Sequence, residues 1–83
     1  MRRFFIKGTD ILVRESNRKY VCAVVYVREN ASMVVHSCHT SFDHARKEIS
    51  RLRADYSRHP MDFNIDYNPS KFVVSELESS GEW

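Results

Sequence analysis

The chain has 83 residues, which is enough for one domain with one hydrophobic core and leaves no room for a second. Its hydrophobic content of 42%, with only two glycines and two prolines, favours a folded body over a disordered one. The net charge of +2 is unevenly spread, with +6 over residues 1–60 and −4 over residues 61–83. This asymmetry either offers a basic surface to an acidic partner or is neutralised internally.

Several features indicate a cytoplasmic protein with no membrane partner. No apolar run is long enough to span a membrane, and residues 1–10 lack the apolar core of a signal peptide. In the cytoplasm the two cysteines, Cys22 and Cys38, are expected to be reduced thiols.

The first half of the chain predicts four short β-strands. They cover residues 3–7, 11–15, 20–28 and 32–38, and turn residues separate them. The third strand has the strongest signal because it is rich in β-branched side chains. One of its faces is entirely aliphatic, and we expect that face to pack beneath a helix. This face consists of Val21, Ala23, Val25 and Val27.

Residues 40–60 predict one amphipathic helix. Their apolar side chains recur at spacings of three and four, which is the helical period. This stripe consists of Phe42, Ala45, Ile49, Leu52 and Tyr56. Thr40 or Ser41 can serve as the N-cap, and Pro60 cannot continue the helix.

The polar face of the helix has two interpretations. Most of its charges can pair with one another at helical contact spacing, which makes an ordinary solvated face. The expected pairs are Asp43–Lys47, Glu48–Arg51 and Arg51–Asp55. Three remaining cations lack an acidic partner on the helix, so they are candidates for contacting phosphates or an acidic partner. These cations are Arg46, Arg53 and Arg58.

After the helix, apolar and polar residues alternate over residues 61–67, which is typical of a half-buried strand. Residues 71–77 predict a final strand, and residues 79–83 a flexible tail. The predicted architecture is therefore one small α+β domain over residues 1–78. It is an antiparallel sheet, a meander of three to four strands, with one amphipathic helix packed on one face, followed by a C-terminal β-hairpin.

The densest polar cluster lies between the fourth strand and the helix. It contains His36, Cys38, His39 and His44. Imidazole and thiolate groups bind zinc and serve in acid–base or nucleophilic catalysis. However, no paired spacing such as Cys-x-x-Cys fixes a metal site, and we expect His36 and Cys38 on one strand face with His39 on the other. We therefore predict no metal, no cofactor and no catalytic residue.

The sheet face away from the helix is expected to place aromatic rings beside cations. The residues involved are Arg3, Phe5, Lys7, Tyr20, Tyr26 and Arg28. Aromatic sheet faces flanked by cations stack unpaired bases. Tyr, Phe and Arg are also the usual hot spots of protein interfaces. Together with the three helix arginines, these are the candidate binding residues.

The leading hypothesis is a small non-enzymatic binding or inhibitor protein, of the compact kind encoded by phages and mobile elements. It would dock on a host or defence macromolecule, and its partner is another protein or a second copy of the chain in a homodimer. The alternative is an RNA- or DNA-binding module that uses the basic helix face and the aromatic sheet face. The third hypothesis is a small ribonuclease that uses His36, His39 or His44.

Overall fold

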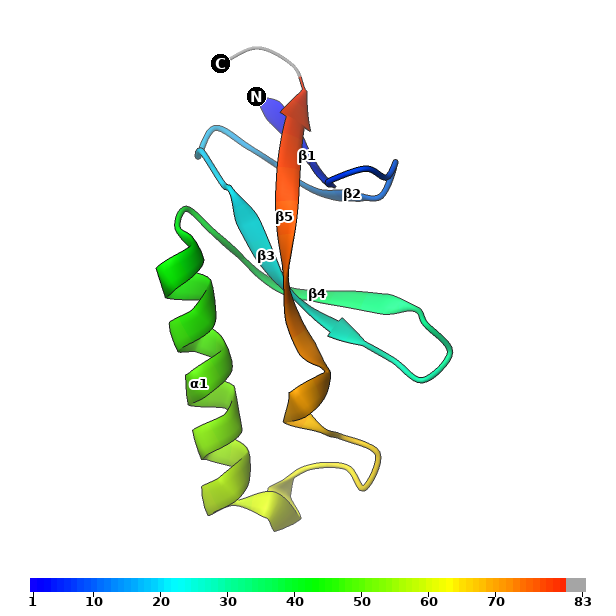
Figure 1. The fold of residues 1–83 in the computed structure, drawn as a ribbon, viewed down its shortest axis with the longest axis vertical. Helices are drawn as coiled ribbons and strands as arrows, with labels where there is room; N and C mark the ends of the chain where they lie inside the picture. Colours follow the sequence, from blue (N-terminus) through cyan, green and yellow to red (C-terminus); the bar gives the residue numbers. More distant parts are fainter. Residues whose placement is uncertain (81–83) are drawn as a thin grey trace.

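The structure is a computed structural model, and it describes residues 1–80. Within this range one helix packs against a five-stranded antiparallel sheet (Figure 1). The predicted α+β class, with one amphipathic helix on one face of an antiparallel sheet, is therefore confirmed. The elements are β1 (Arg2–Ile6), β2 (Leu12–Ser16), β3 (Cys22–Val27), β4 (Met33–His39), α1 (Phe42–Arg58), the 3-10 turns η1 (Pro60–Asp62) and η2 (Pro69–Lys71), and β5 (Phe72–Ser80).

The strand order is β2-β1-β5-β3-β4, so the prediction of a continuous meander is wrong. β1 and β2 form one hairpin, and β3 and β4 form another. Residues 72–76 of β5 pair with β3, whereas residues 77–80 pair with β1. The last strand therefore runs through the centre of the molecule and joins the two hairpins (Figure 1).

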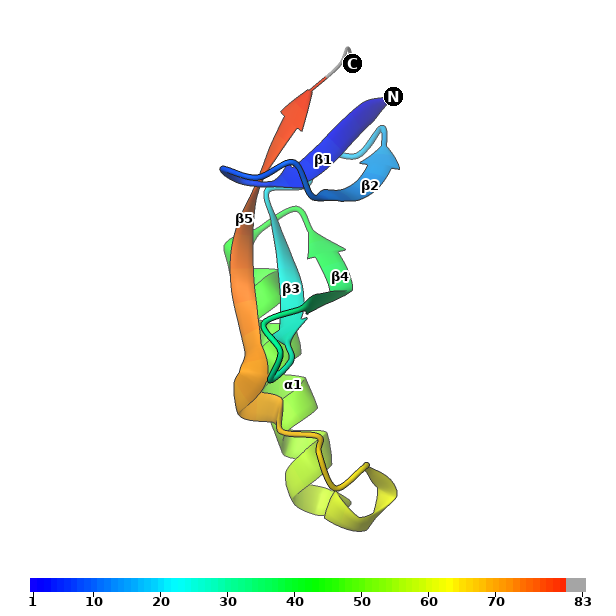
Figure 2. The ribbon, with the colours of Figure 1, turned by 90° about the vertical axis from the view of Figure 1, so that its right-hand side faces the viewer.

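Two hydrophobic clusters lie on opposite faces of β3. The cluster beneath α1 contains Cys22, Val24, Ala45 and Phe72. The other contains Phe4, Ile6, Ala23, Val25 and Leu77. Ala23 and Val25, from the aliphatic face predicted to lie beneath the helix, therefore pack against the β1–β2 hairpin instead, which in Figure 2 lies above β3 while α1 lies behind it. Val21 from the same predicted face does pack against the cluster beneath α1. Both faces of β3 are apolar, so the sequence pattern does not say which one meets the helix.

The helix forms as its periodicity predicts. Ser41 is the N-cap, and its Oγ accepts a hydrogen bond from the backbone N–H of His44 at 3.1 Å. The middle of the apolar stripe faces the sheet: Ala45 is fully buried, and Ile49 and Leu52 pack beside it, whereas Phe42 at the start of the helix is 38% exposed. The cap satisfies one of the free N–H groups at the start of the helix, while the stripe supplies the buried area that stabilises it.

The predicted C-terminal β-hairpin is wrong, because the segment after α1 forms the turn η1 and an irregular loop. Met61 and Ile65 in this segment are 93% and 99% exposed. Phe63 and Tyr67 fold back onto the end of the helix, where their rings stack at 4.8 Å and both contact Tyr56. Phe63 and Tyr67 are four residues apart, and this spacing is compatible with a turn as well as with a strand. The asparagines and prolines of the segment favour turns.

β5 is longer than predicted, and it neutralises part of the basic segment. Ser79 and Ser80, expected in a flexible tail, pair with β1; residues 81–83 of that predicted tail lie outside the described residues. Lys7 forms an ion pair with Glu76 at 3.3 Å. The backbone N–H of Gly8 donates a hydrogen bond to Glu78 at 2.9 Å. Some of the charge asymmetry in the sequence is thus balanced inside the fold.

Candidate binding site

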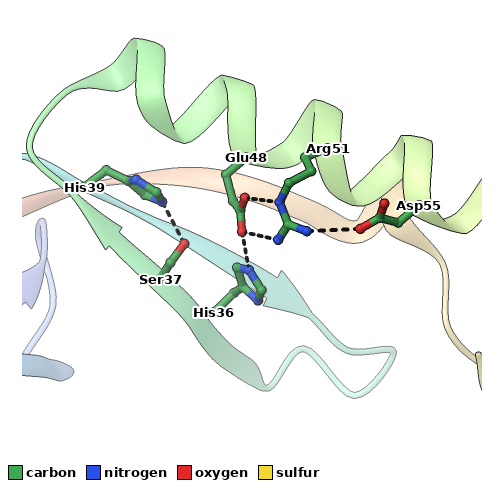
Figure 3. A network of polar contacts seen from close by, with 6 residues as sticks. All are labelled: His36, Ser37, His39, Glu48, Arg51 and Asp55. Atoms are coloured by element: carbon green, nitrogen blue, oxygen red, sulfur yellow. Dashed lines mark hydrogen bonds and ion pairs between the residues drawn. The ribbon is translucent and has the colours of Figure 1, made fainter.

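A β-bulge in β4 determines where its histidines point. Ser37 pairs with Val24 and Val35 pairs with Val25, which leaves His36 as the extra residue between them. The bulge turns the side chain of His36 toward α1 (Figure 3). No sequence signal marked this bulge.

The side chain of His36 is held by a polar network on α1 (Figure 3). Its Nε2 lies 2.8 Å from Oε2 of Glu48. The guanidinium of Arg51 donates two hydrogen bonds to the same carboxylate, at 2.7 and 2.8 Å, and a third to Asp55 at 3.0 Å. The bonds from Arg51, followed by the bond from His36, outweigh burial and lower the pKa of Glu48 from 4.5 to about 2. Glu48 is therefore ionised at neutral pH and connects the helix to β4.

The other candidates for catalysis do not converge on this network. Nε2 of His39 lies 2.7 Å from Oγ of Ser37, and burial lowers the pKa of His39. Cys38 pairs with Ala23 on the opposite sheet face, where burial raises the pKa of its thiol. The expectation that His36 and Cys38 share a face is wrong, because the bulge shifts the alternation by one residue. His44 is exposed in the first turn of α1.

In the described part of the chain, the outer edge of β4 combines a free strand edge with exposed apolar side chains and no Lys, Arg, Asp or Glu. β4 ends the strand order, so within residues 1–80 this edge has no partner strand. Residues 31–42 contain no Lys, Arg, Asp or Glu, although natural edge strands commonly use charge to discourage pairing. By contrast, β2 at the opposite edge carries Arg14 and Glu15. The exposed fractions on β4 are 39% for Met33, 41% for Val34 and 37% for Val35.

A hollow of about 350 Å³ opens beside this edge. It is lined by Tyr26, Arg28, Val34, Val35, His36, Tyr67 and Phe72. A second hollow of about 340 Å³ adjoins it and shares Tyr26, Arg28 and Tyr67. The second hollow also contains the carboxylates of Glu29 and Asp66, whereas the first contains none. We call the first one the β4 hollow.

The aromatic wall of the β4 hollow is held in place by several contacts. The ring of Tyr26 stacks parallel to Tyr67 at 5.8 Å and meets the ring of Phe72 edge-on at 5.0 Å. Its hydroxyl accepts a hydrogen bond from the backbone N–H of Asn68 at 3.1 Å. The ring of His36 meets the ring of Phe72 at 5.5 Å. These contacts tie β3, β4 and β5 to the loop after α1.

The six residues predicted to share the sheet face away from the helix lie in different places. Tyr26 and Arg28 come together at the hollows, on the helix side. Tyr20 lies on the other side, where its ring meets Phe4 edge-on at 5.5 Å. The prediction of one shared face is therefore wrong, since Tyr26 lies on the side of β3 that packs against α1.

The remaining three lie on or just after β1. Phe5 is half-buried and lines a shallow hollow with Glu78 and other residues. Lys7 is paired with Glu76, as described above. Arg3 is exposed and pairs through its backbone with β2 and β5.

The prediction of which helix arginines form ion pairs is only partly correct. The pairs Glu48–Arg51 and Arg51–Asp55 are confirmed. Asp43 pairs at 2.8 Å with Arg46 rather than with Lys47, so Arg46 is not a free cation. Across residues 1–80, Arg53 and Arg58 have no ion-pair partner.

Sequence reasoning missed the β4 hollow and the apolar edge beside it. The uncharged segment over residues 31–42 was a visible signal for the edge. The hollow had none, because Tyr67 reaches it from a loop that the pattern predicted as a strand, and Phe72 reaches it from β5, whose place in the sheet the pattern did not give.

Comparison with family models, curated proteins and solved structures found no match. In the part of the chain that the structure describes, no helix is both long and apolar enough to cross a membrane. Residues 1–80 also contain no group of three or more His, Cys, Asp or Glu side chains that could hold a metal ion.

Proposed function

We propose that this chain is a small binding protein, of the inhibitor type, that docks on another protein through the outer edge of β4. An extended segment of the partner adds to the sheet as a further strand. The observation that carries this proposal is the combination of an unpaired edge, the absence of charge over residues 31–42 and the exposure of Met33, Val34 and Val35.

Strand addition suits this edge energetically. Backbone hydrogen bonds supply affinity, and alternate side chains of the added strand supply specificity through pockets on either side. Burying the three exposed apolar side chains adds roughly 25 cal/mol for each Å² of apolar surface removed from water. The bulge at His36 divides the edge, and residues 33–35 on one side of it carry the exposed apolar side chains that a partner strand would cover.

The state of the basic residues supports a protein partner over the nucleic-acid alternative. Lys7, Arg46 and Arg51 are engaged with carboxylates, which leaves fewer cations for phosphates. One face of the Tyr26 ring is covered by Tyr67, so it offers less surface for stacking a base.

The proposal can be tested with a random library of short peptides selected against the wild type and two variants. Val34→Lys places a charge on the proposed edge, and Met61→Lys places the same charge on a side chain that is 93% exposed outside it. We expect enriched peptides to bind the wild type and Met61→Lys but not Val34→Lys. Circular dichroism of both variants verifies that they are folded.

The amide resonances of residues 33–35 should shift when an enriched peptide is added to the wild type. A library that yields no binder, or binders that tolerate Val34→Lys, would contradict the proposed function.

A further inference from the structure

We infer that the segment docking on β4 is acidic: it carries an Asp or Glu that pairs with Arg28 and, two residues away on the same face of the added strand, an apolar side chain that enters the β4 hollow. This inference rests on the proposed function and adds the chemistry of the partner. It follows from the hollow's position, its charge and its size.

The hollow lies directly beside the part of the edge that can accept a strand. Val34 and Val35 belong both to that edge and to the lining of the hollow. When a strand is added to this edge, its side chains on the α1 side of the sheet therefore reach the hollow while its backbone stays extended. The volume of about 350 Å³ is near the lower end for pockets that enclose a ligand (about 300–1,000 Å³), which suits one apolar side chain.

The charge of the lining selects a carboxylate. Of the described residues, Arg28 is the only Arg or Lys in the lining of the hollow, and no Asp or Glu lines it. The guanidinium of Arg28 has no ion-pair partner within residues 1–80. Arginine binds carboxylates through two parallel hydrogen bonds, which fixes the partner's orientation as well as its charge.

The carboxylates near Arg28 do not weaken its preference for an acidic side chain in the β4 hollow. The carboxylate of Glu48 contacts His36 and accepts two hydrogen bonds from Arg51, so it does not compete for Arg28. The adjoining hollow already contains two carboxylates, Glu29, which is paired with Lys71 at 3.5 Å, and Asp66, so it favours an acidic side chain less than the β4 hollow does. The acidic residue is therefore directed to the side of Arg28 that faces β4.

A peptide fits these groups better than a single-stranded nucleic acid does. An unpaired strand edge hydrogen-bonds to another peptide backbone. A stacked base needs an open aromatic face, and Tyr26 is stacked on Tyr67 on one side and meets the edge of Phe72.

The experiment repeats the peptide selection with Arg28→Glu and with Arg18→Glu, a matched charge reversal in the exposed turn between β2 and β3. We expect peptides selected on the wild type to be rich in Asp or Glu two residues away from an aromatic or aliphatic residue. For one such peptide, Arg28→Glu should weaken binding about tenfold or more, because it replaces a paired charge with a repelling one. Arg28→Glu should also bind the peptide more tightly when the acidic residue of the peptide is changed to Lys. Arg18→Glu should neither weaken binding of the original peptide nor prefer the Lys peptide.

The outcomes separate this inference from the proposed function. Binders that require Val34 but lack acidic residues, or that ignore Arg28→Glu, would overturn the inference and leave strand docking intact. The absence of any binder would overturn both. A mixed-sequence single-stranded RNA that displaces the peptide at moderate salt, with an affinity that falls steeply as salt rises, would also overturn the inference in favour of nucleic acid.

Discussion

At the scale of single residues, the carboxylate of Glu48 is the main polar link between α1 and β4. It accepts two hydrogen bonds from Arg51 and lies 2.8 Å from Nε2 of His36, and its side chain is only 19% exposed. Charge-assisted hydrogen bonds of this kind are stronger than those of an exposed ion pair, because they are partly shielded from solvent.

We predict that Glu48→Gln lowers the free energy of unfolding at pH 7 by about 1 kcal/mol, since the amide keeps the shape but loses the charge. The native fold lowers the pKa of Glu48 from 4.5 to about 2. Its stabilising contribution is therefore complete above pH 4.5 and is lost as the pH falls toward 2. Urea unfolding of both proteins across this range should show their difference in stability shrinking in acid.

Asp62→Asn is the matched control for Glu48→Gln. The side chain of Asp62 is 77% exposed and lies 4.0 Å from Nδ1 of His59, so its loss should change stability by less than about 0.5 kcal/mol. A Glu48→Gln effect that is the same at pH 3 and pH 7 would mean that the ionised carboxylate is not the cause.

At the scale of elements, the start of α1 distinguishes two residues that the sequence left as alternatives. The Oγ of Ser41 caps the helix, whereas Thr40 precedes the cap. We predict that Ser41→Ala lowers stability by about 1 kcal/mol, which corresponds to a fall of about 4–8 °C in Tm for a domain of this size. Thr40→Ala should have a much smaller effect in the same thermal scan. Equal losses in the two variants would contradict the assignment of the cap.

The helix was predictable and the sheet order was not, for physical reasons that differ between the elements. The stripe around Ala45 and the capping residues are local signals, so α1 follows from the sequence alone. β3 is apolar on both faces, and only the packing of α1 and the β1–β2 hairpin decides which face meets which. The alternation around Phe63 resembles a strand, but its aromatic residues gain more by packing on Tyr56 at the end of the helix.

The candidate site was predictable only in part. Tyr26 and Arg28 were identified from their residue types, and the structure brings them together. The bulge at His36 shifts the alternation by one residue, which no pattern in a single sequence reveals. The partners of Tyr26 from the loop and β5 are also out of reach of local reasoning, because they lie about forty residues further along the chain.

At the scale of the whole molecule, β5 connects the two hairpins, because it pairs with β1 at one end and with β3 at the other. Leu77 packs in the cluster with β1, while Phe72 on the same strand packs beneath α1. We predict that Leu77→Ala lowers stability by about 2–5 kcal/mol. The far-ultraviolet signal of the backbone and the near-ultraviolet signal of the tyrosines should be lost in one transition at the lowered temperature.

Val73→Ala is the control on the same strand. Val73 is 42% exposed, so its truncation should change stability by about 0.5 kcal/mol or less. If Leu77→Ala melted only the β1–β2 hairpin and left the tyrosine signal at its wild-type temperature, the two halves would be independent.

The split pairing of β5 also has a consequence for the order of events during synthesis. Each hairpin can close as soon as it leaves the ribosome, but neither can join the other until residues 72–80 have emerged. Until then, the edges that β5 will occupy on β1 and β3 are exposed to other chains. Contacts of such long sequence separation form slowly, so we expect assembly of the sheet to begin only after β5 has been translated.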